Sequence, residues 1–190
     1  SIRRQRQMCI RDRKNTMPSG RTHDRITVLS VVPITILFYF IFRRKELILW
    51  FGLSYIFSGL MFGPDLDIYS LQYKRWGIGR WIWLPYQYSF KHRSFLSHGF
   101  LIGTIIRLIY FFVIVMIFTI FINMVIQFFL GSTYNWWILF TTNYNKLRAQ
   151  YLEEAVTIFL GLELGSMSHS ISDTLVTNFK RLKTKFLKTK

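Results

Sequence analysis

The chain is poor in cysteine and in acidic residues. The first shortage limits its possible cross-links and metal ligands, and the second makes its net charge strongly positive. Cys9 is the only cysteine among 190 residues, which excludes an internal disulfide framework and a thiolate metal cluster. Any bound metal must therefore use histidine and carboxylate ligands. Only 9 Asp and Glu accompany 25 Lys and Arg, so the formal net charge is +16. The length leaves room for one domain and argues against a multi-domain enzyme.

Apolar residues, by contrast, are abundant. Hydrophobic residues make up 51% of the chain and aromatics 18%, which excludes intrinsic disorder because so much apolar surface must be buried or embedded. The Lys and Arg residues of a nucleic-acid binder normally interleave with a half-polar fold. Here they lie between long apolar blocks, as in a polytopic membrane protein whose basic loops face anionic headgroups. We therefore expect a lipid bilayer as a partner and no nucleic acid.

The apolar blocks predict an all-α membrane protein with about four transmembrane or membrane-embedded helices, at residues 26–42, 47–64, 99–130 and 154–172. The first block reaches about 26 Å as a helix, which is enough for a bilayer core. The fourth is interrupted by Glu163 and is too polar to face lipid on all sides, so we expect it to pack against the other three.

Two charged residues, Arg107 and Glu163, lie inside these blocks. A lone charge at that depth is costly, so each is expected to turn toward the bundle interior and find the other or a buried polar group. The alternative is that Arg107 snorkels to the interface on its long side chain and that Glu163 is protonated.

The remaining segments are assigned by composition. Residues 65–98 are predicted to form a long loop, rich in Trp and Tyr, at the membrane interface. A single helical membrane domain is expected at 17–178, and a basic tail at 179–190. Residues 1–16 are expected to be disordered or non-native, because QRQMCIRDR resembles read-through from a sequencing adapter. A short basic arm or the end of a targeting peptide is the alternative.

The four histidines, His23, His92, His98 and His169, each lie near the end of a predicted span. Successive spans cross in opposite directions, so the start of the first, the end of the second, the start of the third and the end of the fourth share one membrane face. The same face receives four carboxylates, namely Asp24, Asp65, Asp67 and Asp173. The sequence therefore predicts that these distant groups meet.

Imidazole nitrogens and carboxylate oxygens together are suited to a divalent metal, with Zn, Mn, Fe or Mg favoured according to their ratio. His169 and Asp173 are one helical turn apart, as a chelating pair should be. Each element alone has an ordinary explanation. A histidine near a bilayer can be an interfacial hydrogen-bonding group, and Asp65 and Asp67 can end a helix and pair with Arg75 or Arg93.

Four stretches carry a family resemblance: MPSGRTHDRIT, GLMFGPDLDIYSLQYKRWG, WIWLPYQYSFKHRSFLSHG and ELGSMSHSISD. They resemble a family of cyanobacterial metal-binding membrane proteins of unknown function. That family is similar to the YdjM-like membrane-bound metal-dependent hydrolases and, more remotely, to zinc-dependent phospholipase C. The resemblance implies zinc as the metal, and it implies seven ligands: His23, Asp65, Asp67, His92, His98, His169 and Asp173. The last pair is HxxxD here, where the zinc phospholipases have HxxxE.

Two functions remain open at this stage. The first is a membrane-embedded metal-dependent hydrolase of phosphoester or lipid-like substrates, with Lys91 and Arg93 holding phosphate and Asp24 as general base. The second is a non-catalytic accessory subunit of a larger membrane complex, such as a photosynthetic one, that docks through its aromatic loop. The positive-inside rule predicts a cytoplasmic or stromal metal face in a thylakoid or bacterial inner membrane.

Overall fold

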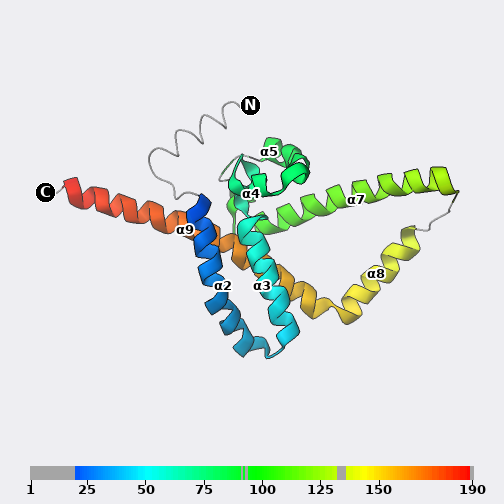
Figure 1. Ribbon diagram of the computed structural model, residues 1–190, viewed down its shortest axis with the longest axis horizontal. Helices are drawn as coiled ribbons and strands as arrows, with labels where there is room; N and C mark the ends of the chain where they lie inside the picture. Colours follow the sequence, from blue (N-terminus) through cyan, green and yellow to red (C-terminus); the bar gives the residue numbers. More distant parts are fainter. Residues whose placement is uncertain (1–19, 91, 93, 132–135, 189–190) are drawn as a thin grey trace.

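The structure is a computed structural model that describes residues 20–90, 92, 94–131 and 136–188, and every regular element in these ranges is helical. Five long helices make up most of the fold (Figure 1): α2 (Gly20–Phe42), α3 (Lys45–Leu60), α7 (Ile102–Leu130), α8 (Trp136–Gln150) and α9 (Leu152–Lys188). The all-helical prediction is confirmed. The expectations for residues 1–16 lie outside the described residues.

Helices α2 and α3 form an antiparallel hairpin (Figure 1). Arg43 ends α2 with φ 53°, in the left-handed region that terminates a helix. The rings of Phe38 and Phe51 stack with their centroids 3.8 Å apart, and the hydroxyls of Ser30 and Tyr55 lie 2.7 Å apart across the hairpin. Apolar packing and one polar contact thus fix the two helices side by side.

Helix α9 packs on α3 through glycines that the sequence analysis did not single out. A Cβ added at Gly161 would lie 2.6 Å from Phe51 O, and one at Gly165 would lie 2.2 Å from Tyr55 O. Ser58 Oγ donates a hydrogen bond to Leu162 O across the same contact. The spacing Gly161-x3-Gly165 is the small-residue pattern that lets membrane helices approach closely.

In the part of the chain that the structure describes, three helices are long and apolar enough to cross a membrane, at Thr22–Phe42, Lys45–Asp67 and Ile102–Phe129. Helix α9 is not among them, so the predicted fourth element forms as a helix packed mainly on α3, and the count of four membrane helices is not confirmed. Helix α8 was not predicted. Helix α7 extends away from the α2–α3 hairpin (Figure 1), and most of its apolar side chains are exposed.

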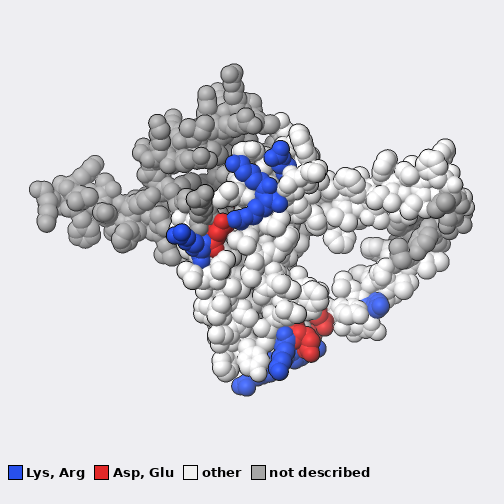
Figure 2. Space-filling model, in the orientation of Figure 1, with Lys and Arg blue, Asp and Glu red and all other residues white. Residues whose placement is uncertain are grey.

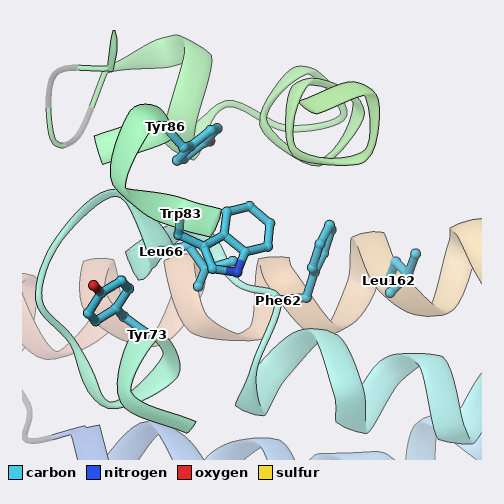
Figure 3. Packing of buried hydrophobic residues seen from close by; sticks show 6 residues of the cluster. All are labelled: Phe62, Leu66, Tyr73, Trp83, Tyr86 and Leu162. Carbon is cyan, nitrogen blue, oxygen red and sulfur yellow. The ribbon is translucent and has the colours of Figure 1, made fainter. Parts of the chain in front are cut away.

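The predicted aromatic loop instead consists of short helices: η1 (Pro64–Asp67), α4 (Leu71–Arg75), η2 (Gly77–Trp83), α5 (Leu84–Ser89) and α6 (Phe95–His98). Trp83 and Tyr86 are fully buried in the main apolar cluster, beside Phe62 and Leu66 (Figure 3). Burial raises the pKa of Tyr86 to about 12. The segment was predicted as a loop because its Pro, Gly and charges break the helical pattern, whereas its aromatic side chains supply a core of their own.

Candidate metal centre

The chain turns sharply after α3, and this turn presents two carboxylates. Pro64 occupies the first position of η1, where its missing N–H costs nothing. Ser70 Oγ donates to the carbonyl of Asp65 at 2.8 Å, and Gln72 Nε2 donates to the carbonyl of Gly59 at 2.9 Å. These bonds tie the start of α4 (Leu71–Arg75) both to η1 and to the end of α3, and so hold the turn that carries the two aspartates.

Asp65 and Asp67 both face histidines from other elements. Asp65 Oδ1 lies 3.8 Å from His98 Nε2, and its Oδ2 lies 3.1 Å from His169 Nε2. Asp67 Oδ1 lies 2.9 Å from His92 Nδ1, and its Oδ2 lies 3.8 Å from His98 Nδ1. The structure therefore brings residues from η1, the segment before α7 and helix α9 into one cluster, as predicted, although His169 lies in the middle of α9 and not at the end of a span.

The cluster fits a divalent cation. Asp65, His92 and His98 each offer one ligand atom, and these atoms all lie within 4.8 Å of one another. Within the described residues, His98 Nε2 and Asp67 Oδ2 are buried and lack a hydrogen-bond partner. Buried polar atoms normally have a partner, and a cation held by Asp65, His92 and His98 would supply one to His98 Nε2. The donor set of imidazole nitrogen and carboxylate oxygen suits zinc and its neighbours in the first transition row.

Hydrogen bonds select the ring nitrogens that face a metal. His92 Nδ1 is bonded to Asp67 Oδ1, and His98 Nδ1 lies 2.9 Å from Ser97 Oγ. The Ser97 hydroxyl donates to Ser94 O at 3.3 Å, so it can accept from His98 Nδ1–H. Metal-binding histidines characteristically donate from the ring nitrogen that does not bind the metal, which fixes ring orientation and tautomer. Nε2 is then the metal-facing atom of both rings.

His23 joins α2 to the same region. Its ring stacks on His169 with centroids 4.0 Å apart, and its Nδ1 lies 2.6 Å from Ser172 Oγ. Both histidines are buried, at 5% and 3% exposure. The structure therefore places His23 beside the predicted ligand His169 and outside the Asp65–His92–His98 group.

Three further predicted residues have different outcomes. Both oxygens of Asp24 accept hydrogen bonds from the Arg75 guanidinium, at 2.9 and 2.5 Å, so proton transfer by Asp24 would first have to break this ion pair. Arg75 pairs with Asp24 and not with Asp65 or Asp67, so one of the two arginine partners considered above for Asp65 and Asp67 is excluded. Arg93 and the side chain of Asp173 lie outside the described residues.

The two charged residues inside the predicted apolar blocks are buried, at 1% exposure for Arg107 and 3% for Glu163, so Arg107 does not snorkel to the surface. Arg107 donates to Ser97 O, Thr104 Oγ1 and Ser166 Oγ, while Glu163 accepts from the Leu101 N–H. Each residue therefore contacts buried polar groups, which is one of the two predicted outcomes. The other outcome, a direct ion pair between Arg107 and Glu163, does not occur.

Comparison with known proteins places the chain in a family. An uncharacterized protein of Aquifex aeolicus (strain VF5) is 31% identical over 61 residues, which is 32% of this chain and 43% of that relative. No solved structure matches the chain. Residues 18–183 match the family described as "Uncharacterized metal-binding protein (DUF2227)". The chain therefore belongs to this family of metal-binding proteins.

Proposed function

We propose that the protein is an integral membrane metal-dependent hydrolase of phosphoester or lipid-like substrates. The carrying observation is that the cluster is part-exposed: the side chains of Asp65, His92 and His98 are 22%, 16% and 16% exposed. Catalytic metal sites keep a position open to water and substrate, whereas structural sites are closed by four protein ligands. The likeness to the YdjM-like hydrolases noted in the sequence agrees with this proposal.

The roles of the residues follow from their contacts. Asp65, His92 and His98 hold the metal, which when bound lowers the pKa of a water molecule and stabilises negative charge on the substrate. Asp67 orients His92 through its 2.9 Å hydrogen bond, and Ser97 orients His98. His169 lies against the second oxygen of Asp65 and is the next ligand in reach.

The charge distribution supports a membrane position for the hairpin. Charged side chains gather at the two ends of α2 and α3, with an uncharged band between them (Figure 2). One group includes Asp24, Arg25 and Arg75, and the other includes Arg43 and Arg44. From Arg25 to Arg43 a helix rises about 27 Å, the thickness of a bilayer core. The metal cluster lies at the first of these ends.

We propose that this end faces the cytoplasm or stroma, in a bacterial inner membrane or a thylakoid. The proposal predicts that, in intact cells, an impermeant thiol reagent reaches a cysteine introduced at Glu46, on the outer side, and does not reach one introduced at Gln72 or Arg80, on the cytoplasmic side. Arg80 is the better reporter because Gln72 is buried. In sealed inside-out vesicles, an impermeant maleimide should label Arg80→Cys and leave Glu46→Cys unlabelled. The reverse pattern contradicts the orientation.

Hydrolysis is tested with the purified protein in detergent. We expect zinc- or manganese-loaded protein to cleave bis(p-nitrophenyl) phosphate or a phospholipid, and a chelator to abolish the activity until metal is restored. Asp65→Ala and His98→Ala should each lower the rate at least about a hundredfold, because each removes a metal ligand. Glu153→Gln, which changes a carboxylate paired with Arg44 at the other end of the hairpin, is the matched control. Equal rates in Asp65→Ala and the control contradict the proposal.

A second function is favoured by one observation. Helix α7 is almost entirely apolar, and most of its side chains are exposed on all sides, so it must contact lipid or other membrane proteins. In this alternative the protein is a non-catalytic accessory subunit of a larger membrane complex, and its metal serves structure alone. Metal binding without hydrolysis, together with co-purification of a defined membrane complex, would favour it over the hydrolase.

A further inference from the structure

The segment between α6 and α7 brings His98 to the metal centre through a strained turn. Leu101, the residue before α7, has φ 58°, in the left-handed region that non-glycine residues rarely adopt. Such a backbone persists only where its surroundings hold it in place. Two buried charged side chains from different helices, Arg107 of α7 and Glu163 of α9, form hydrogen bonds to the backbone of this turn.

Arg107 reaches back along α7 to the residue that orients His98. Its Nη1 donates to Ser97 O at 2.8 Å, and its Nη2 donates to Thr104 Oγ1 at 2.9 Å and to Ser166 Oγ at 2.7 Å. Ser97 Oγ in turn contacts His98 Nδ1 at 2.9 Å. One guanidinium thus links α7 and α9 to the backbone of Ser97, one hydrogen bond away from a candidate metal ligand.

Glu163 holds the other end of the same turn. Its Oε1 accepts a 2.9 Å hydrogen bond from the N–H of Leu101, the strained residue. Glu163 and Ser166 both belong to α9, which carries His169 one turn after Ser166. The contacts of the turn with α9 therefore set where His98 lies relative to His169 and to Asp65 between them.

Gly103 makes the approach of the guanidinium feasible. A Cβ at this position would lie 2.8 Å from Ser97 O and 3.5 Å from Arg107 Nη1. The first distance is shorter than side-chain Cβ atoms tolerate, so a side chain here would push the Ser97 carbonyl away from its donor. Glycine, which has no side chain, therefore leaves room for the hydrogen bond between Arg107 and Ser97 O.

We infer that Arg107 and Glu163 are positioning residues of the metal centre: they fix the turn at residues 97–101 so that His98 Nε2 faces Asp65. The inference rests on the proposed metal site and adds residues that bind no metal themselves.

The test is Co²⁺ titration of the full chain in detergent, for wild type, Arg107→Lys, His98→Ala and the double variant. Lysine keeps the charge but its single ammonium cannot replace the planar fork that reaches three acceptors. We expect Arg107→Lys to weaken Co²⁺ binding about tenfold to a hundredfold. It should also change the visible Co²⁺ spectrum in the same direction as His98→Ala. In the His98→Ala background, Arg107→Lys should have no further effect, because there is no imidazole left to position.

Two smaller substitutions test the same inference with less risk of unfolding the protein. Ser97→Ala removes only the hydroxyl next to His98 and should weaken Co²⁺ binding about tenfold. Thr104→Val removes one Arg107 contact but leaves the bond to Ser97 O, and should bind Co²⁺ within about twofold of wild type. Additive losses for Arg107→Lys and His98→Ala, or an unchanged Co²⁺ spectrum in Arg107→Lys, overturn this inference while leaving the metal site intact. A wild type that binds no Co²⁺ overturns the proposed function and this inference together.

Discussion

Replacing Asp65 with alanine is expected to lower zinc affinity by at least about a hundredfold, or about 2.7 kcal/mol. Asp65 is the carboxylate between His98 and His169, at 3.8 and 3.1 Å, and it belongs to the group whose ligand atoms lie within 4.8 Å. Its loss removes the negative charge that offsets a divalent cation next to neutral imidazoles. Isothermal titration of the metal-free protein with zinc measures the change.

The same substitution has a consequence for stability. A ligand that binds only the folded state stabilises it by about 2.7 kcal/mol when present at a hundred times its Kd. Zinc should therefore raise the unfolding temperature of wild type and of Glu153→Gln, and leave that of Asp65→Ala unchanged. If zinc stabilises Asp65→Ala as much as wild type, Asp65 is not a ligand.

Gly165→Ala is expected to destabilise the fold by about 1–3 kcal/mol, the range found for overpacked cores. The added Cβ would lie 2.2 Å from Tyr55 O, and a backbone carbonyl inside α3 cannot move aside without shifting the helix. His169 lies one turn further along α9, so the shift should also weaken metal binding. Thermal unfolding in detergent, followed by circular dichroism, measures the loss.

Gly52→Ala on α3 is the matched control for this prediction. Its added Cβ would lie 3.7 Å from Thr35 Oγ1, an ordinary van der Waals contact. Alanine also favours a helix over glycine by up to about 1 kcal/mol, so Gly52→Ala should be neutral or stabilising. Equal effects of the two substitutions would mean that close α3–α9 contact does not hold the fold together.

Much of the meeting of the site residues could be predicted because it depends on topology. His23, His92 and His98 lie near helix ends, and alternating helix directions bring such ends together. His169 instead joins them from the middle of α9, which continues to Lys188 and does not end near residue 172 as predicted. The position of Asp65 between His98 and His169 could not be predicted, since it depends on the η1 turn that Ser70 and Gln72 fix through hydrogen bonds.

Other features of the fold could not be predicted from the sequence, for physical reasons. Residues 65–98 were predicted as a loop because Pro and Gly interrupt every helical period, yet Trp83 and Tyr86 provide tertiary burial that short helices need. Gly161 and Gly165 carry a signal that is visible in the sequence, the small-x3-small spacing of close helix contacts, although the spacing alone does not identify α3 as the partner helix. The partners of Arg107 and Glu163 depend on how α7 meets α9, which no local pattern encodes.

The central claim is that the clustered aspartates and histidines bind a divalent metal, and its most direct test is the metal content of the wild-type protein. Protein purified in detergent without chelator, supplied with zinc and dialysed against metal-free buffer, should retain at least about one zinc per chain by elemental analysis. Asp65→Ala treated in the same way should retain almost none. Wild-type protein that keeps no zinc, or keeps as much as Asp65→Ala does, would contradict the account.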